Sequence, residues 1–184
     1  MEGLAHARTA ERLDPLSPAT GATVGWVLYY SRRYDDAMVQ LEQVVAREPQ
    51  FATARIALGR ALLMAGLPDR AIAELERAVQ DAGHASSTVA LLAHALGCAG
   101  RLDEARTLAA ELEVTAASRY VSGYYLALPY LGAGDTARAL DHLEAAVRER
   151  AAQLIYIGTE PVVDVLRDEP RFRAIIDALQ FPAA

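Results

Sequence analysis

The sequence predicts an all-α fold built from consecutive antiparallel helix pairs, and three observations lead to this prediction. Alanine and leucine, which both favour helices, dominate the composition. The sequence contains none of the long β-branched runs that buried strands require. Short phrases of similar sequence, each ending in alanine, also recur along the chain at one fixed spacing.

The recurring alanines define the period. Ala37, Ala71, Ala105 and Ala139 stand 34 residues apart in succession, with no insertion between them. Other positions keep the same register, since leucine or alanine follows each of these alanines four residues later. A constant period of this length indicates stacked helix–turn–helix repeats.

The residues before each alanine indicate how one helix of a pair ends. Gly66, Gly100 and Gly134 stand five residues before their alanines, whereas the first repeat has Arg32 at this position. Glycine adopts the left-handed conformation that ends a helix without a Cβ penalty. We therefore expect the turn between paired helices here, with Arg32 as a departure from the pattern.

The period also predicts the helix boundaries. We expect paired helices near 18–31 and 34–47, 52–65 and 68–80, 86–99 and 102–114, and 119–133 and 136–149. Pro129 should kink the helix that contains it. Past residue 150 the period stops, and two short helices near 161–167 and 170–179 carry an apolar face.

These columns resemble the tetratricopeptide-repeat (TPR) family. The resemblance implies a right-handed α–α superhelix, a TPR solenoid, with a C-terminal capping helical segment. We expect one continuous domain with the second helix of a partial preceding repeat at 4–15, TPR 1 at 18–51, TPR 2 at 52–85, TPR 3 at 86–119, TPR 4 at 120–153 and the cap at 154–184.

Further phrases are similar to TPR modules at the C-terminal end of bacterial multidomain regulators, such as winged-helix activators, Ser/Thr kinases and adenylate cyclases. They are Leu13-Asp14-Pro15-Leu16-Ser17-Pro18, Arg33-Tyr34-Asp35-Asp36-Ala37, Arg119-Tyr120-Val121-Ser122 and Leu166-Arg167-Asp168-Glu169-Pro170-Arg171-Phe172. This resemblance implies a regulatory or assembly role in a bacterial protein. Because residues 4–15 read as half a repeat, we expect the chain to be the C-terminal piece of a longer protein.

In TPR stacks the first helix of each pair lines the concave face, which predicts where a partner binds. The candidate peptide-binding residues on this face are Trp26, Tyr29, Tyr30, Arg60, Met64, His94, Tyr124 and Leu128. Aromatic rings together with arginine are typical of binding hot spots. The alternative is that these rings fill the interior of the superhelix or lie under the C-terminal segment.

Composition and motifs exclude several classes of function. A net charge of −6 disfavours a nucleic-acid surface, and no apolar run is long enough to span a membrane. The sequence has no phosphate-binding loop or nucleophile motif, so we expect neither an enzyme nor a cofactor. His94 and Cys98 form the single metal-type pair at helical spacing, which is too few ligands for a metal site. The lone cysteine and the absence of a secretory signal favour a cytoplasmic location.

Three hypotheses follow for function. The first is a scaffold or regulatory module that binds a protein or peptide segment in its concave groove. The alternative is self-association, in which the open half repeat at 4–15 stacks on another copy to form a homo-oligomer. The third, which the lack of catalytic motifs disfavours, is an enzyme or small-ligand receptor that uses the concave pocket around His94, Cys98, Tyr124 and Arg60. A clamp for a terminal carboxylate is disfavoured, because the sequence contains neither lysine nor asparagine.

Overall fold

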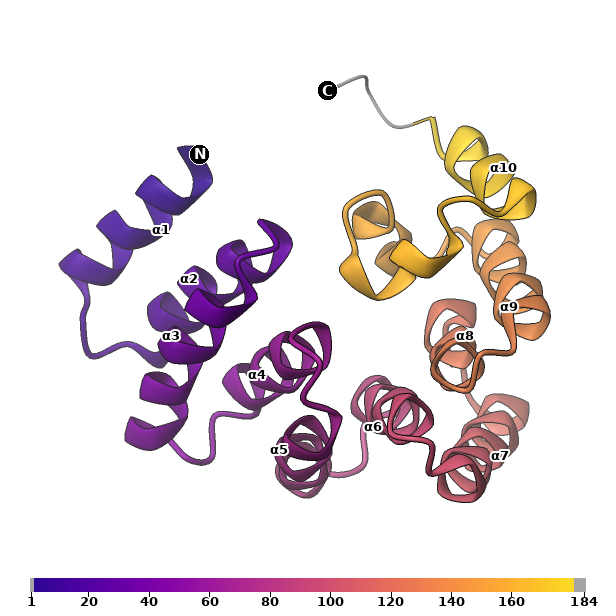
Figure 1. Ribbon diagram of the computed structural model, residues 1–184, viewed down its shortest axis with the longest axis horizontal. Helices are drawn as coiled ribbons and strands as arrows, with labels where there is room; N and C mark the ends of the chain where they lie inside the picture. Colours follow the sequence, from indigo (N-terminus) through magenta and orange to yellow (C-terminus); the bar gives the residue numbers. More distant parts are fainter. Residues whose placement is uncertain (1, 181–184) are drawn as a thin grey trace. The chain divides into compact units, whose positions relative to one another are not determined.

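The computed structural model describes residues 2–180, and every regular element within them is helical, which confirms the all-α prediction (Figure 1). In chain order the elements are α1 (Glu2–Leu13), α2 (Pro18–Tyr30), α3 (Tyr34–Arg47), α4 (Ala52–Met64), α5 (Pro68–Asp81), α6 (Ser86–Cys98), α7 (Leu102–Ser118), α8 (Gly123–Gly132), α9 (Thr136–Arg148), the 3-10 helices η1 (Ala152–Tyr156) and η2 (Pro161–Leu166), and α10 (Pro170–Ala178). The predicted cap extends to residue 184, and its last four positions, 181–184, lie outside the described residues.

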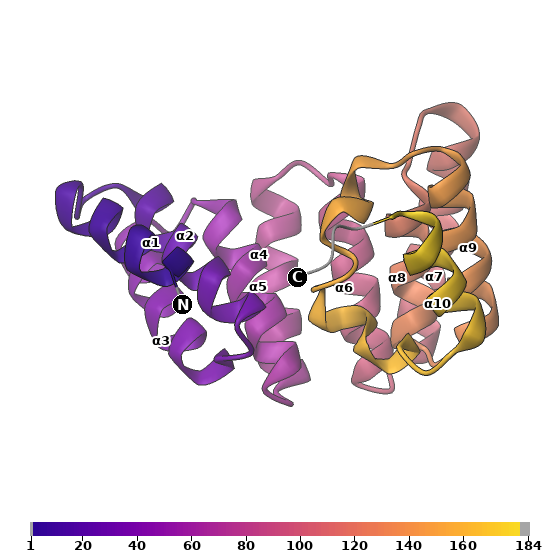
Figure 2. The ribbon, with the colours of Figure 1, turned by 90° about the horizontal axis from the view of Figure 1, so that it is seen from above.

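The helices form two compact units, Met1–Thr88 and Val89–Ala184. In the first unit, α2 packs against α3 and α4 packs against α5, and both pairs are visible in two views (Figures 1 and 2). A Cβ added to Gly25 would lie 2.4 Å from the Leu41 side chain, so the absence of a side chain lets these two helices approach closely. Ala37 and Leu41 are fully buried in this seam, as the repeat columns predict.

The turns between paired helices have the left-handed conformation that the glycine column predicts. Gly66, Gly100 and Gly134 have φ of 76°, 77° and 76°, and Arg32 adopts the same conformation with φ of 61°. The backbone N–H of Arg33 donates to Leu28 O at 3.0 Å, which satisfies a carbonyl at the end of α2. Arg32 thus makes the turn of a glycine at a conformational cost of about 1–2 kcal/mol.

The second unit departs from two predicted boundaries. Helix α7 was expected to end near 114 but continues to Ser118, and α8 begins at Gly123 rather than near 119. Arg119 has extended backbone angles, φ −147° and ψ 157°, which end α7. The Ser122 side chain accepts a hydrogen bond from Tyr124 N and so caps the start of α8. Pro129 lies inside α8 as predicted.

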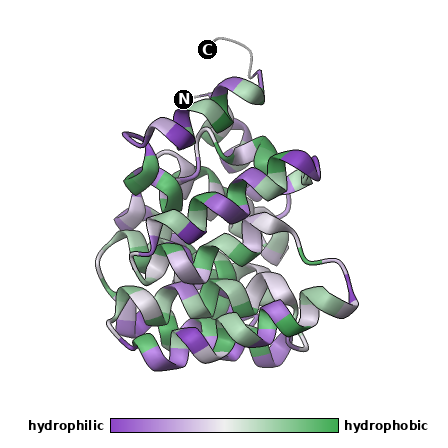
Figure 3. Ribbon diagram, turned by 90° about the vertical axis from the view of Figure 1, so that its right-hand side faces the viewer, coloured by the Kyte–Doolittle hydropathy of each residue, from purple (hydrophilic) through white to green (hydrophobic). Residues whose placement is uncertain are grey.

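The segment after α9 packs through apolar side chains. Its buried residues are Leu154, Ile157, Val162, Val163, Leu166, Phe172 and Ile175. Helix α10 lies against α9, and Arg171 joins them by pairing with Asp141 at 2.7 Å and Glu144 at 2.8 Å. Helix α9 is buried on one side, through Ala139, Leu140, Leu143 and Ala146, and hydrophilic and hydrophobic residues are accordingly mixed along the ribbons in Figure 3.

Candidate functional site

An aromatic cluster of Trp26, Tyr29, Tyr30 and Tyr34 lies where α2 ends and α3 begins. Ring centroids of Trp26 and Tyr30 are 5.9 Å apart with planes 24° apart, because these residues are one helical turn apart. The Tyr29 ring lies edge-on to the Trp26 ring, with centroids 5.8 Å apart, and is tilted by 54° against the Tyr34 ring, with centroids 6.0 Å apart. The sequence predicted the three α2 rings as one surface but did not include Tyr34, which the left-handed turn at Arg32 brings next to Tyr29.

Arg60, which extends from α4, supports this cluster from the neighbouring repeat. Its guanidinium carbon lies 5.6 Å from the Trp26 ring centroid and 5.5 Å from that of Tyr29. These are cation–π distances, and the interaction strengthens when the cation is desolvated. Arg60 is only 7% exposed, so it holds the rings in place within the unit.

Exposure separates the residues of the cluster into two groups. Tyr29 is fully buried and belongs to the core, as does Arg60. Trp26, Tyr30 and Tyr34 are half-buried, so part of each ring stays at the surface, and so is Met64, which holds in α4 the repeat position of Tyr30. We call Trp26, Tyr30 and Met64 the aromatic shelf.

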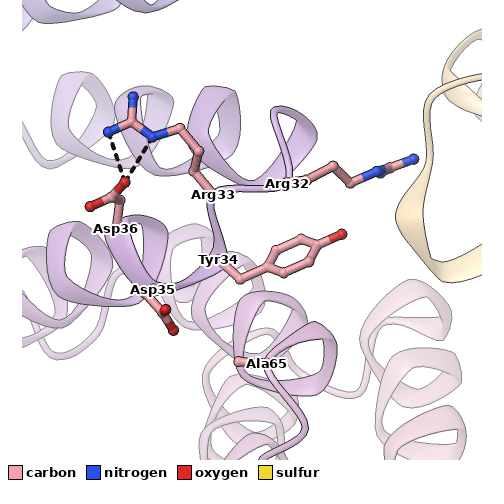
Figure 4. Close-up of a pocket in the computed structure, with 6 residues that line it drawn as sticks. All are labelled: Arg32, Arg33, Tyr34, Asp35, Asp36 and Ala65. Atoms are coloured by element: carbon pink, nitrogen blue, oxygen red, sulfur yellow. Dashed lines mark hydrogen bonds and ion pairs between the residues drawn. The ribbon is translucent and has the colours of Figure 1, made fainter.

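A hollow of about 460 Å³ adjoins the cluster, and sequence reasoning missed it (Figure 4). Its lining residues are Arg32, Arg33, Tyr34, Asp35, Asp36 and Ala65. Arg33 and Asp36 form an ion pair at 2.7 Å on its rim. The sequence did contain a signal for this hollow, namely Arg32 at the repeat position that is glycine in the other three repeats. The turn of the first repeat therefore carries a guanidinium group where the other turns carry no side chain.

The candidate residues of the second unit lie in the core. His94 is 4% exposed, Tyr124 4% and Leu128 1%. His94 Nδ1 lies 3.0 Å from Leu128 O, so the imidazole joins α6 to α8. A Cβ on Gly132 would lie 2.2 Å from His94 O, which shows how close these two helices are. These side chains pack the unit together and do not form a surface.

Trp26, Arg60, His94 and Leu128 occupy one repeat column, since they are successively 34 residues apart. Of these four, only Trp26 is appreciably exposed. Arg60, His94 and Leu128 therefore fit the alternative interpretation, in which the side chains of this column fill the interior of the superhelix. A binding surface has to be sought at Trp26 and its neighbours.

Chemistry for catalysis or metal binding is sparse in the part of the chain that the structure describes. Among residues 2–180, no group of three metal-type side chains lies together. Cys98 Sγ lies 3.5 Å from His94 Nε2, and desolvation raises the pKa of this thiol above its ordinary value. A raised pKa disfavours the thiolate and hence nucleophilic chemistry. Within the described residues, no helix is both long and apolar enough to cross a membrane.

The helix pairs and their left-handed turns define an α-helical repeat protein. Residues 25–86 match one family described as tetratricopeptide repeat, and residues 87–111 match a second family of the same description. Residues 25–111 therefore consist of TPR repeats, and the described chain has the all-α fold of a TPR solenoid. Proteins of this class are generally protein–protein interaction modules.

Solved structures with the same fold share little sequence with this chain. A thermophilic TPR protein from Thermus thermophilus, TTC0263, superposes with a TM-score of 0.67 at 17% identity over 97% of this chain and 89% of its own. YrrB, a TPR protein with an unusual peptide-binding site, gives 0.54 at 21% identity over 84% and 80%. The Cut9–Hcn1 hetero-tetramer of APC/C gives 0.66 at 18% identity over 94% of this chain and 34% of that one. No curated protein matched the chain.

Proposed function

We propose that this chain is an interaction module that binds a protein or peptide segment on the aromatic shelf. The observation that supports this most is the stacked, half-buried pair of Trp26 and Tyr30, fixed from behind by Tyr29 and Arg60. Rings of this kind bury a large area on binding and lose little conformational freedom. Because their neighbours already hold them, the shelf is preorganised.

The shelf favours a ligand that presents apolar or aromatic side chains in a short extended or helical segment. Met64, which holds in α4 the repeat position that Tyr30 holds in α2, offers a flexible thioether that adapts to irregular apolar shapes. The adjoining hollow supplies Arg32, Asp35 and other charged groups for the flanks of such a segment. Peptide binding in YrrB is consistent with a peptide ligand for this fold.

We place this binding in a regulatory or assembly context, in the cytoplasm of a bacterium, without catalysis or cofactor. The support is the resemblance of Leu13–Pro18 and Leu166–Phe172 to TPR modules of bacterial regulators. The partner class remains a protein or peptide segment. On this proposal the candidate residues His94, Tyr124 and Leu128 maintain the fold and do not touch the ligand.

Trp26 provides a site-specific assay, because it is the only tryptophan in the sequence. Peptides selected on the wild-type protein from a random display library should shift its fluorescence on titration. Truncation of one hot-spot ring typically costs about 2 kcal/mol or more, so Tyr30→Ala should weaken binding roughly 30-fold. Met64→Ala should weaken it less.

The matched control is Tyr120→Ala, which removes a tyrosine that is 70% exposed in the second unit. Its affinity should equal that of the wild type, and circular dichroism should show all variants folded. Selected peptides that bind Tyr30→Ala and Met64→Ala with wild-type affinity, and leave Trp26 fluorescence unchanged, would show that the shelf is not the binding site.

A further inference from the structure

The turn between α2 and α3 lines the hollow beside the aromatic shelf, and the other repeats provide internal controls for its residues. Positions 34 residues apart have the same place in successive helix pairs. A side chain that recurs at such a position with the same contact has a structural role common to the repeats. A side chain without an equivalent is specific to the first repeat.

Three charged residues of this hollow have roles that recur. Arg33 pairs with Asp36 at 2.7 Å, and Arg101 pairs with Glu104 at 2.6 Å at the same positions two repeats later. Asp35 stands in the first turn of α3, and acidic residues also stand in the first turns of α5 and α7. There they favour the positive end of the helix dipole. These three side chains therefore belong to the framework of the repeat.

Arg32 and Tyr34 have no such equivalents. Glycine replaces Arg32 in the other three repeats, and proline, leucine or threonine replaces Tyr34. Arg32 is exposed and has φ of 61°, which is unfavourable for a residue with a Cβ. Positive φ also occurs at His84, Arg150 and Gln180, but these follow α5, α9 and α10, where no glycine column exists. The first repeat thus keeps an exposed guanidinium in a strained turn, and such strain is typical of functional sites.

The two side chains extend to the same side of the turn, whereas Arg33 and Asp36 pair on the other side (Figure 4). The Tyr34 ring lies 6.0 Å from that of Tyr29, which supports the shelf from behind. A guanidinium and a phenol hydroxyl both donate hydrogen bonds. The five N–H groups of a guanidinium also allow it to bind an external group alongside a contact within the chain. We call Arg32 and Tyr34 the donor pair.

A carboxylate is the ligand group that suits the donor pair, because its two oxygens match the fork of N–H groups on arginine. We infer that the donor pair binds the side-chain carboxylate of an aspartate or glutamate in the peptide ligand. The inference rests on the proposed function and narrows it. The ligand of the shelf is then a segment that has an acidic residue beside its apolar ones.

Peptides selected on the full chain from a random display library test this inference. They are synthesised with acetylated N-termini and amidated C-termini, so that only side chains supply carboxylates. Each selected peptide should carry aspartate or glutamate beside its apolar residues. Replacing that residue by asparagine or glutamine should weaken binding to the wild type roughly 10-fold, as expected for the loss of one hydrogen bond to a charged group.

Arg32→Gly should weaken binding of the acidic peptide by the same factor. Because glycine relieves the strained turn, the variant should unfold at no lower temperature than the wild type, so the weaker binding would not come from unfolding. The neutral peptide should bind Arg32→Gly and the wild type equally, since both complexes lack the same charge pair. The matched control is Arg33→Gln, which removes a guanidinium from the other side of the turn and should bind the acidic peptide like the wild type.

Selected peptides without acidic residues would overturn the inference, as would equal losses in Arg33→Gln and Arg32→Gly. Tyr30→Ala separates this inference from the proposed function. If Tyr30→Ala weakens binding and Arg32→Gly does not, the donor pair plays no part and only this inference is wrong. If Arg32→Gly alone weakens binding, the shelf proposal is wrong. If neither variant does, both are wrong.

Discussion

Replacing Gly132 by alanine should destabilise the second unit by about 2–4 kcal/mol, because the α6–α8 crossing has no space for a methyl group. The added Cβ would lie 2.2 Å from His94 O and 2.8 Å from both His94 C and Cα. All three are backbone atoms, so no side-chain rotation relieves the contact. Ordinary van der Waals contact begins near 3.4 Å, so the helices must separate by about 1 Å.

Two losses contribute to the magnitude. A separation of about 1 Å forfeits up to half of the dispersion energy at each affected contact. It also stretches the buried hydrogen bond between His94 Nδ1 and Leu128 O, now 3.0 Å, whose loss costs about 1–3 kcal/mol. The higher helix propensity of alanine stabilises the folded variant by about 1 kcal/mol. This gain is smaller than the two losses together, so the substitution should still lower the free energy of unfolding.

Urea unfolding followed by circular dichroism measures the effect, and hydrogen exchange locates it in α6 and α8. Gly3→Ala is the matched control, since a Cβ there meets only Val27 Cγ1 at 4.0 Å and should cost no stability. Gly97→Ala strains the same crossing from the other side, where the Cβ would lie 2.5 Å from Gly132 C. The double variant should cost less than the two single costs combined, because one separation relieves both contacts. A Gly132→Ala protein with wild-type stability would refute this reasoning.

Three further outcomes are expected. Arg32 and Gly66 both have positive φ, which glycine tolerates better than other residues. Arg32→Gly should therefore stabilise the protein by about 0.5–1 kcal/mol in thermal unfolding, and Gly66→Ala should destabilise it by about 1 kcal/mol. Effects of the same sign in the two variants would contradict this explanation. Gln40→Ala should cost about 1–3 kcal/mol and speed hydrogen exchange in α1, because the buried amide accepts from Arg8 at 2.7 Å and donates to Glu11 at 2.5 Å; unchanged exchange would refute it. Desolvation lowers the pKa of His142 in the folded protein, so the unfolded chain binds a proton more readily at acid pH. The wild type should therefore lose stability as the pH falls below about 6.5, the ordinary histidine value. Urea midpoints should fall less steeply with decreasing pH in His142→Gln than in the wild type, and equal slopes would contradict this assignment.

The period predicted the helices well because the columns between paired helices keep one packing role from repeat to repeat. Ala37 and Leu41 are buried as their column requires, and the left-handed turns lie where glycine recurs. The period could not fix the link between α7 and α8. There the chain shifts the boundary by several residues, since Ser122 supplies an N-cap and Arg119 an extended break without moving the columns.

The candidate site was harder to predict than the fold. Helical spacing places Trp26, Arg60, His94 and Leu128 in one column, but it does not say how deeply each lies. Arg60 and His94 are buried because one stacks on two rings and the other bonds a backbone carbonyl. Those partners lie in other helices, so only the three-dimensional structure identifies them. The exposed edge of α1, by contrast, was expected from the half repeat at 4–15.

The attachment of α10 makes ionic strength a selective probe of this end of the second unit. In the described part of the second unit, ion pairs such as Arg101 with Glu104 and Arg106 with Asp103 lie within one helix or its cap, so added salt screens them without separating two helices. Arg171 instead reaches Asp141 and Glu144 on α9, through contacts open to solvent. Concentrated salt should thus loosen the last helix while the repeats behind it keep their packing, and buried Phe172 limits how far it detaches.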